Sequence, residues 1–248
     1  MKKNKITFGS WITIGHPAIA EIMAKSGYDW LCVDMEHSLI NLDQMTSISR
    51  SLELNNCFTF VRVGKNDELE IKKVLDAGVK GIIVPQINSK EDAQRLIEFS
   101  HYPPKGNRGV GLSRAQGYGR NFENYKNRIN NELEIIAIIE SKQAIENLHD
   151  ILSTDGITGS MIGPYDLSAS YGNPGDIMNK EVQQAIKSYE NIAKKFDKPF
   201  GYHAVNDSNK QILSKIKNGY KFIILGFDAK FLSDASDQYV SRIKNAIK

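Results

Sequence analysis

Two carboxylates stand at the ends of two apolar runs in this 248-residue chain, in positions that allow them to act together. Glu140 ends the run LEIIAIIE (133–140), and Asp166 comes soon after the run GSMIG (159–163). Continuous apolar runs are typical of strands buried on both faces of a parallel sheet, and the carboxyl ends of such strands lie at one edge. Neighbouring carboxylates repel each other unless a cation or a proton lies between them. We therefore predict that Glu140 and Asp166 bind a divalent metal.

More polar side chains stand where other apolar runs end. Asp34, Glu36 and His37 lie at or just beyond the end of WLCVDM, and Arg62 lies near the end of FTFVRV. Charged side chains are rarely buried unless they are paired. Arg62 must therefore face an anion, which would be either a substrate or Asp34 in a structural ion pair.

Each of these polar residues also has a structural explanation. Glu140 opens a helical pattern and would be stabilised by the helix dipole, and Asp166 would cap a short helix. His37 would be an ordinary loop histidine. For His203 and Asp228, which lie near the ends of the last two apolar runs, we predict a structural role. Only the joint occurrence of polar residues at strand ends favours an active site.

Eight apolar, β-rich runs alternate with helical patterns along the chain. The predicted strands are 7–14, 30–35, 58–63, 81–85, 133–140, 159–163, 199–204 and 221–228. The predicted helices are 17–27, 42–55, 68–78, 89–100, 141–152, 180–196, 208–219 and 229–248. Eight strands, each followed by a helix, in a chain of about 250 residues predict an α/β fold of the (β/α)8 TIM-barrel type. A doubly wound open sheet is the alternative. We expect residues 1–248 to form a single (β/α)8 barrel domain, because no composition shift marks a boundary.

Residues 101–132 interrupt this alternation with a long segment that is rich in Gly and Arg and poor in aliphatic residues. Loops of this length are uncommon without a role. The segment follows a helix and precedes a strand, so simple topology places it at the floor of the barrel, away from the active face. A structural or oligomer role and a substrate-shielding role both remain open.

Composition and charge exclude several classes of protein. With 41% hydrophobic and 25% charged residues, the chain has the composition of an ordinary globular protein. Its 32 basic and 29 acidic side chains nearly balance, which predicts no nucleic-acid binding. No apolar run is long enough for a membrane span or, after the basic tip MKKNK, for a signal peptide. Cys32 and Cys57 are too few for a disulfide framework, and we expect a cytoplasmic protein with reduced thiols.

Six motifs in order resemble the HpcH/HpaI family of metal-dependent (class II) pyruvate aldolases: VDMEHS, VRV, VPQINSKEDA, YPPKGNRGVG, IIE and GPYDLS. The family includes 4-hydroxy-2-oxoheptanedioate aldolase and the 2-keto-3-deoxy sugar acid aldolases. The resemblance runs from Phe8 to Asp228, and the EH, GPxDLS and YPPxGxRG elements are specific in combination. It implies a phosphoenolpyruvate/pyruvate-type barrel and a carbon–carbon lyase. This lyase would cleave or form a 4-hydroxy-2-oxo acid from pyruvate and an aldehyde through a metal-stabilised enolate.

The resemblance further implies a cofactor and a role for each site residue. Glu140 and Asp166 would bind Mg²⁺, Mn²⁺ or Co²⁺, and water and substrate oxygens would complete an octahedral shell. Arg62 would meet the keto oxygen and stabilise the enolate. His37, oriented by Asp34, would be the acid/base and would act through a water on the metal.

The resemblance implies a carboxylate site and an oligomer as well. Backbone amides around Tyr165 and Asp166, just after Gly163-Pro164, would hold the pyruvate carboxylate. Asp76 matches a position that in relatives reaches toward a neighbouring subunit's site. The family forms homo-oligomers, often hexamers (trimers of dimers), with the C-terminal helix exchanged between subunits. The closing segment is amphipathic and compatible with this, with apolar residues Phe231, Leu232, Tyr239, Val240 and Ile243.

Two further features of the sequence bear on the aldolase prediction: one concerns the mechanism, and the other departs from the family pattern. No lysine lies in a predicted strand near its carboxyl end, which argues against a Schiff-base mechanism. Relatives commonly carry glutamine two residues before the metal-binding glutamate, where this chain has Ile138. The alternatives are a related lyase that acts on another keto acid, for example by decarboxylating oxaloacetate, and a catalytically weak barrel that binds a keto acid.

The sequence does not specify the aldehyde. Arg108, Arg114 and Arg120 are candidates to bind an acidic or phosphorylated tail of the aldehyde.

Overall fold

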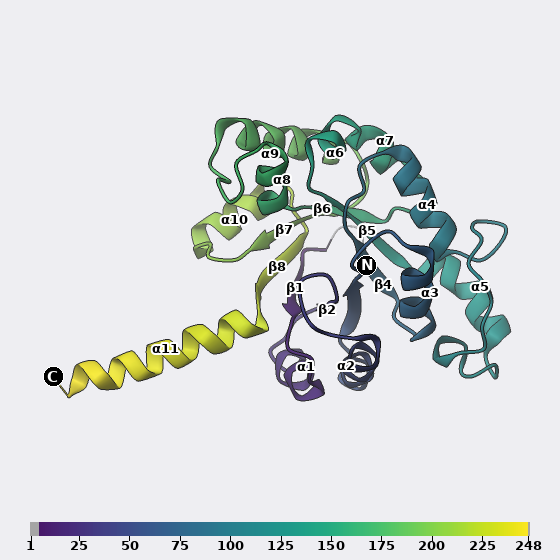
Figure 1. The fold of residues 1–248 in the computed structure, drawn as a ribbon, viewed down its shortest axis with the longest axis horizontal. Helices are drawn as coiled ribbons and strands as arrows, with labels where there is room; N and C mark the ends of the chain where they lie inside the picture. Colours follow the sequence, from purple (N-terminus) through teal and green to yellow (C-terminus); the bar gives the residue numbers. More distant parts are fainter. Residues whose placement is uncertain (1–4, 248) are drawn as a thin grey trace.

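Eight parallel strands close into a barrel in strict chain order (Figure 1). The structure, a computed structural model, describes residues 5–247; the first four residues of the basic tip and the last residue of the chain lie outside them. The strands are β1 (Thr7–Ile12), β2 (Trp30–Asp34), β3 (Phe58–Arg62), β4 (Gly81–Val84), β5 (Glu134–Ile139), β6 (Gly159–Ile162), β7 (Phe200–Ala204) and β8 (Phe222–Phe227). β8 pairs with β1 and closes the sheet, with Thr7 opposite Phe222. The predicted TIM barrel and all eight predicted strands are confirmed, and the open sheet is excluded.

Helices surround the barrel and connect successive strands (Figure 1). They are α1 (Pro17–Ala24), α2 (Leu42–Leu54), α3 (Glu68–Asp76), α4 (Lys90–Ser100), α5 (Phe122–Glu132), α6 (Lys142–Glu146), α7 (Leu148–Ser153), α8 (Pro164–Ser170), α9 (Lys180–Ala193), α10 (Asn209–Lys217) and α11 (Asp228–Ala246), with a 3₁₀ turn at Arg114–Gln116. The predicted helix at 141–152 is two helices that meet at Asn147. All the other predicted helices are present, with shifts of a few residues at their ends.

Aromatic side chains fill the inside of the barrel toward its amino-terminal end. The rings of Trp30 and Phe222 stack with their centroids 4.1 Å apart, and Phe60 packs edge-on against both. Glycines on neighbouring strands leave room for these rings: a Cβ atom on Gly201 would lie 2.8 Å from the Phe222 ring. The barrel is therefore a packed core and not a pore, and it can be entered only from the face where the strands end.

The segment 101–132, expected to be a long loop, contains the 3₁₀ turn and helix α5. Arg108 is almost completely buried in it, pairs with Asp76 at 2.6 Å and donates a hydrogen bond to the Tyr125 hydroxyl. Arg114 pairs with Glu53 at the end of α2. These contacts lie where α2 and α3 end, at the floor of the barrel, as the topology predicted. Within one chain this segment is therefore structural.

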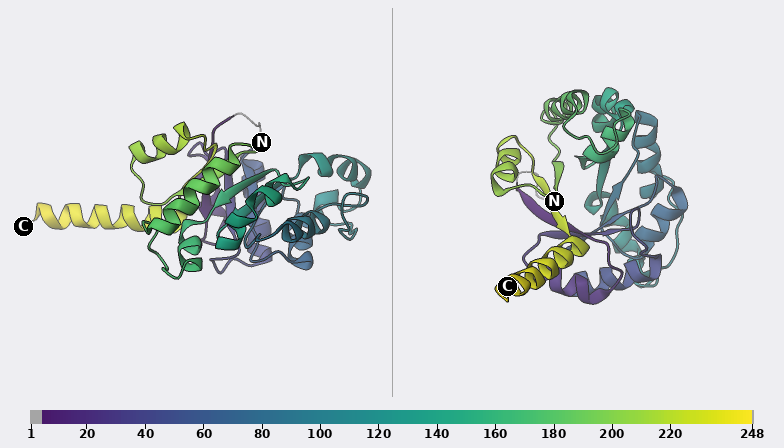
Figure 2. Two further views of the ribbon diagram at one scale, coloured as in Figure 1. Left: turned by 90° about the horizontal axis from the view of Figure 1, so that it is seen from above. Right: turned by 60° about the vertical axis from the view of Figure 1, so that its left-hand side comes forward.

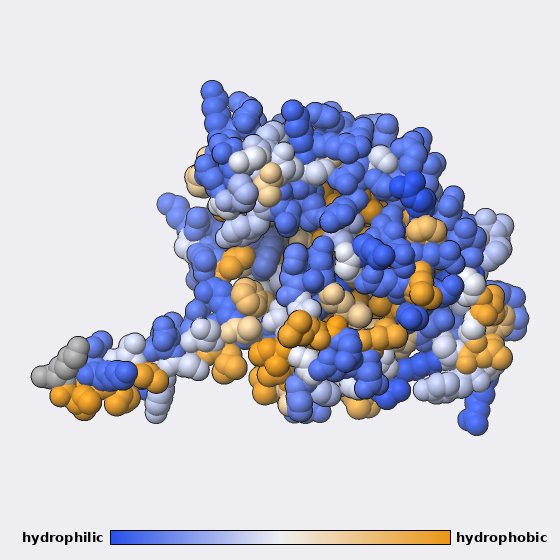
Figure 3. Space-filling view, in the orientation of Figure 1, coloured by the Kyte–Doolittle hydropathy of each residue, from blue (hydrophilic) through white to orange (hydrophobic). Residues whose placement is uncertain are grey.

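Helix α11 leaves the barrel and projects away from it (Figure 2). Asp228, its first residue, is buried and accepts hydrogen bonds from the main chain of Thr13 and Ile14, which ties the start of α11 to β1. No other residue of the helix is buried. Apolar side chains line one edge of the projecting helix (Figure 3), and Leu232 and Tyr239 are each about 60% exposed. Among the described residues, no helix is both long and apolar enough to cross a membrane.

Candidate functional site

A cavity of about 380 Å³ opens at the carboxyl ends of the strands. All eight residues predicted to form the site line it: Asp34, His37, Arg62, Glu140, Gly163, Pro164, Tyr165 and Asp166. They come from loops or strand ends of β2, β3, β5 and β6, which parallel pairing brings to one face. Trp11, Ile138 and Met161 rise from the barrel core and form the apolar floor of the cavity. The structure therefore brings the predicted residues together.

Arg62 is the best-anchored charge in the cavity. Its Nε donates to Asp34 Oδ1 at 2.8 Å, its Nη2 donates to Oδ2 at 2.5 Å, and its Nη1 lies 3.3 Å from Glu36 Oε2. The guanidinium also lies over the Trp11 ring, 4.4 Å from its centroid. Burial alone would lower the pKa of Arg62, but its two carboxylate partners raise it, so the guanidinium stays charged. A fork held on one side by Asp34 has a fixed direction in which to meet an anionic oxygen.

The contacts of Asp34 differ from the prediction that it orients the His37 ring. Asp34 Oδ1 accepts hydrogen bonds from the main-chain N–H groups of Glu36 and His37, and both carboxylate oxygens bind Arg62. The His37 side chain is 61% exposed, and its Nε2 lies 3.6 Å from Glu36 Oε2. Asp34 therefore fixes the loop that carries His37 and the arginine, and Glu36 is the acidic neighbour of the imidazole. Asp34 thus bonds the main chain of His37 and not its ring, while both of its oxygens bind the guanidinium.

A main-chain hydrogen bond and a neighbouring glycine position the Glu140 carboxylate. The N–H of Gln86 donates to Glu140 Oε1 at 2.6 Å, and Gln86 adopts a positive φ of 57°, unusual for a residue other than glycine. A Cβ atom at position 163 would lie 3.0 Å from Glu140 Cβ and 3.3 Å from Oε2, so Gly163 leaves the space in which the carboxylate lies. Burial, together with the charges of Glu36 and Asp166, raises the pKa of Glu140 to about 7 against the lowering effect of the Gln86 hydrogen bond.

These features fit a divalent cation. A buried carboxylate beside two others is stabilised in its charged form by a cation, and hard divalent cations prefer oxygen ligands. Among residues 5–247 no group of three or more His, Cys, Asp or Glu side chains has a geometry that could hold a metal ion. Glu140 and Asp166 would thus supply only part of a coordination shell, which leaves positions for water and substrate oxygens.

Asp166 lies in the first turn of α8, which begins at Pro164. The first hydrogen bond within this helix runs from the Leu167 N–H to the Gly163 carbonyl, so the N–H groups of Tyr165 and Asp166 precede it. The predicted short helix at this point is confirmed. Donors at a helix start can bind a carboxylate group.

Glu36 and Gln86 were not among the predicted site residues, although both stand at strand ends. Glu36 Oε2 is buried without a hydrogen bond from any described residue, and burial raises the pKa of this carboxyl group to about 7. The EH pair in VDMEHS marks Glu36 in the sequence. The contact of Gln86 is made by its main chain, so its side-chain type carries no signal.

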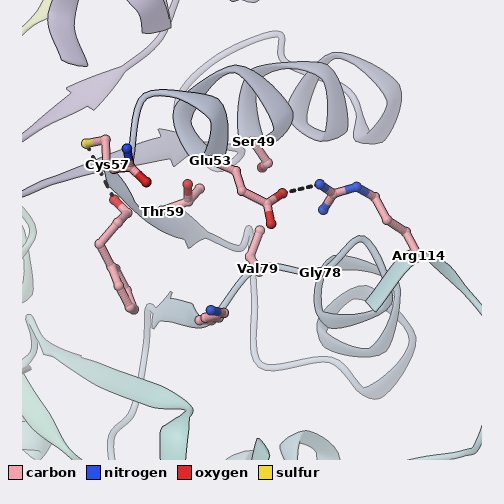
Figure 4. Close-up of a pocket in the computed structure, with 10 residues that line it drawn as sticks. Ser49, Glu53, Cys57, Thr59, Gly78, Val79 and Arg114 are labelled. Carbon is pink, nitrogen blue, oxygen red and sulfur yellow. Dashed lines mark hydrogen bonds and ion pairs between the residues drawn. The ribbon is translucent and has the colours of Figure 1, made fainter. Parts of the chain in front are cut away.

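A second hollow of about 280 Å³ lies at the floor of the barrel, between α2 and the turn before β4 (Figure 4). The Arg114–Glu53 ion pair spans it, and burial raises the pKa of the Cys57 thiol in its wall to about 11. It shares no residue with the cavity at the strand ends. We assign it no chemistry.

A closed (β/α)8 barrel that gathers carboxylates and an anchored arginine where its strands end has the architecture typical of a barrel enzyme. The chain belongs to the HpcH/HpaI aldolase/citrate lyase family, whose pattern it matches over residues 7–235. It is 35% identical over 248 residues to the 2-keto-3-deoxy-L-rhamnonate aldolase of Escherichia coli (strain K12), covering 99% of this chain and 91% of that protein. The family resemblance inferred from the motifs is confirmed, and the protein is an aldolase, that is, a lyase.

Solved structures agree in fold. An HpcH/HpaI aldolase/citrate lyase family protein from Burkholderia cenocepacia J2315 superposes with a TM-score of 0.92 at 28% identity, covering 97% of this chain and 95% of that one. The citrate synthase SbnG superposes with a TM-score of 0.87 at 26% identity, covering 98% and 96%.

Proposed function

We propose that the protein is a metal-dependent aldolase. It would cleave a 4-hydroxy-2-oxo acid to pyruvate and an aldehyde, or form that acid from the two. The observation that carries the proposal is the position of Arg62, fixed by Asp34 and facing the same cavity as Glu140 and Asp166. Breaking the bond between C3 and C4 leaves a negative charge that spreads onto the keto oxygen. An arginine held in place before the charge develops stabilises it without reorganisation.

Glu140 and Asp166 would hold the metal, and their oxygen ligands suit Mg²⁺, Mn²⁺ or Co²⁺. When bound, the cation draws electron density from the keto oxygen of the substrate and thereby makes the C3 protons more acidic. No lysine is among the described residues that line the cavity, which supports this route over a Schiff base. Ile138, at the position where relatives commonly carry glutamine, lies in the apolar floor and so offers no polar group to the substrate.

The remaining site residues bind the substrate and move protons. The N–H groups of Tyr165 and Asp166, after Gly163-Pro164, would hold the carboxylate of the keto acid. His37 would exchange the proton of the C4 hydroxyl, because it is an exposed titratable side chain that lines the cavity and is not one of the two carboxylates proposed to hold the metal.

Exchange of the pyruvate methyl protons with deuterated water, followed by NMR, tests the proposal without knowledge of the aldehyde. We expect exchange that requires Mg²⁺, Mn²⁺ or Co²⁺ and is lost in Glu140→Gln, which keeps the size of the side chain but not its charge. Glu146→Gln, an exchange of the same type on α6, is the control. A wild-type protein that binds metal but exchanges no pyruvate protons would contradict the proposal.

Similarity to the citrate synthase SbnG favours a second candidate: condensation or decarboxylation of another keto acid, such as oxaloacetate. Incubation with oxaloacetate, with and without an acetyl thioester, distinguishes the two. Citrate formation or metal-dependent decarboxylation faster than pyruvate exchange would favour the second candidate. Exchange of pyruvate alone would favour the aldolase, and no turnover of either acid would favour a barrel that only binds keto acids.

We further propose that this one-domain chain forms a homo-oligomer through α11, with a hexamer built as a trimer of dimers as the expected form. A helix whose apolar residues Leu232, Tyr239 and Val240 are at least half exposed in the single chain supports this. Light scattering after size exclusion should show a smaller assembly for Val240→Asp with Ile243→Asp than for the control Ser241→Asp. Equal masses for all three proteins would remove α11 from the interface.

A further inference from the structure

One buried carboxylate oxygen lies between two side chains of the active site. Glu36 Oε2 lies 3.3 Å from Arg62 Nη1 and 3.6 Å from His37 Nε2. No group of residues 5–247 forms a hydrogen bond with this oxygen. A buried acceptor without a hydrogen bond costs free energy, so its position beside two donors calls for a role. Glu36 is not among the described residues that line the cavity, and any such role must act through its two neighbours.

The turn after β2 holds the Glu36 carboxylate in this place. Asp34 Oδ1 accepts hydrogen bonds from the main-chain N–H groups of Glu36 at 3.0 Å and His37 at 3.1 Å. These bonds fix the main chain of two consecutive residues whose side chains differ in their surroundings: that of Glu36 is 14% exposed and that of His37 is 61% exposed. The buried carboxylate is thereby held beside the guanidinium, while the imidazole reaches the cavity.

Asp34 alone does not fix the plane of the Arg62 guanidinium. Its two hydrogen bonds go to Nε and Nη2, which lie along one edge of the group. Two parallel bonds along one edge leave the plane able to tilt about that edge. Nη1 lies on the other edge, and Glu36 is the carboxylate beside it. Because both side chains are only 14% exposed, their charges are screened less than at the surface, and their attraction opposes the tilt.

We propose that Glu36 is a positioning residue for the reaction: it holds the Arg62 plane toward the keto oxygen and the His37 ring toward the C4 hydroxyl. This inference depends on the proposed function, which gives these roles to the two side chains. In cleavage His37 takes the hydroxyl proton while the electron pair of the C3–C4 bond moves onto the keto oxygen. Both groups must be in place at the same moment, and one carboxylate between them keeps their separation constant.

The sign of the effect separates positioning from charge. Glu36 is a negative charge near a site where negative charge develops, so its removal should speed enolate formation if charge is all that matters. Removal of a positioning residue should slow it. Glu36→Leu keeps roughly the size of the side chain without an acceptor, and Glu36→Gln keeps an acceptor at the same distance. Under the charge explanation both variants are faster than the wild type; under the positioning explanation both are slower, Glu36→Leu more so.

The first test measures exchange of the pyruvate methyl protons with deuterated water at saturating Mg²⁺. We expect kcat to fall by about tenfold in Glu36→Leu with KM for pyruvate unchanged, a loss of the size seen when the support of an active-site group is removed. Glu36→Gln should retain part of the lost rate. The affinity for Mn²⁺ should be unchanged in both variants, which a general disturbance of the site would not allow. The control Glu68→Gln changes an exposed residue of α3 and should match the wild type.

A double-mutant cycle tests the contact with His37. In the cleavage of 4-hydroxy-2-oxopentanoate, Glu36→Leu should lower kcat by about tenfold when His37 is present. The same change should have a smaller effect in the His37→Gln background, because one of the two groups that Glu36 positions is already lost. Equal factors in the two backgrounds would overturn the part of the inference that concerns His37.

Binding of oxalate, a planar dianion that resembles the pyruvate enolate, decides the inference without turnover. With Mn²⁺ bound, calorimetric titration should give an oxalate affinity about tenfold weaker in Glu36→Leu than in the wild type. An oxalate affinity or an exchange rate that is unchanged or higher in Glu36→Leu would overturn the inference. A wild type that exchanges no pyruvate protons would refute the proposed function, and the oxalate titration would still decide the role of Glu36.

Discussion

His101 makes the stability of the barrel depend on pH in a way that can be isolated. The residue caps the carboxyl end of α4, its ring is buried, and its Nδ1 lies 3.1 Å from the Ile97 carbonyl oxygen. Burial, helped by the charges of Lys105 and Arg108, lowers its pKa from 6.5 to about 4. The folded protein therefore binds this proton far less readily than the unfolded chain does.

The size and sign of the effect follow from the shift. Each pKa unit is worth about 1.4 kcal/mol, so lowering the pKa from 6.5 to about 4 corresponds to about 3 kcal/mol. Above about pH 6.5 both states are neutral at this site, and His101 has no effect on the pH dependence. As the pH falls to about 4 the unfolded state gains the proton first, so the free energy of unfolding falls by that amount. This is a large part of the about 5–15 kcal/mol typical of a domain.

Two carboxyl groups titrate over the same range with the opposite sign. The pKa values of Glu36 and Glu140 are raised to about 7, so the folded state binds their protons more tightly and stability falls as the pH rises. The slope of the wild type alone is therefore not diagnostic. Comparison with His101→Gln, which cannot titrate, cancels the contribution of the two glutamates.

Urea unfolding across this pH range, at one protein concentration, provides the measurement. The difference in unfolding free energy between the wild type and His101→Gln should change by about 3 kcal/mol in favour of the variant from neutral pH to about pH 4. The exposed His149, changed to Gln, is the matched control and should show no such change. A difference between the wild type and His101→Gln that is constant over the range would show that His101 titrates normally, and would refute the reasoning from burial.

Three changes test the geometry of the active site. Gln86→Val should weaken metal binding to Glu140 by about tenfold more than Gln86→Gly, because a branched residue resists the positive φ that aims the N–H; calorimetric titration with Mn²⁺ giving equal affinities would contradict this. Gly163→Ala should weaken metal binding by about tenfold, since its Cβ would crowd Glu140; an unchanged affinity would mean that the carboxylate can move aside. Arg62→Lys should lower kcat for pyruvate proton exchange by about 10²–10³-fold, because a lysine cannot hold both Asp34 oxygens and still face the substrate; a loss confined to KM would assign Arg62 to binding alone.

Strands were predictable here because their signal is local. Runs such as IIAII and FII are buried on both faces in the barrel, and an apolar run can be recognised without knowing its partner strand. Helix α5 was not predicted because its local signal is weak. Of its eleven residues only Tyr125 and Ile129 are buried, and two buried positions do not make a recognisable amphipathic pattern. At the break between α6 and α7, the Asn147 side chain donates a hydrogen bond to the Asn88 carbonyl, a contact with a distant segment that the local sequence does not reveal.

The members of the site could be predicted, whereas the sequence left two partners open for Arg62, a substrate anion or Asp34. Residue type and strand-end position identified Arg62, Glu140 and Asp166, and the barrel brought them together. The Asp34–Arg62 pair depends on the burial of the guanidinium, which β1, β2 and β3 produce together: Arg62 lies over Trp11 and binds Asp34.

The aromatic stack of Trp30, Phe60 and Phe222 bears on kinetics as well as on stability. Because it closes the lower end of the barrel, both products of a cleavage leave through one opening. If the keto acid binds to Glu140, Asp166 and Arg62 as proposed, it lies beneath the aldehyde. The aldehyde then departs first and the keto acid second, and in synthesis the keto acid binds first. Pyruvate should consequently inhibit cleavage competitively, and the aldehyde non-competitively.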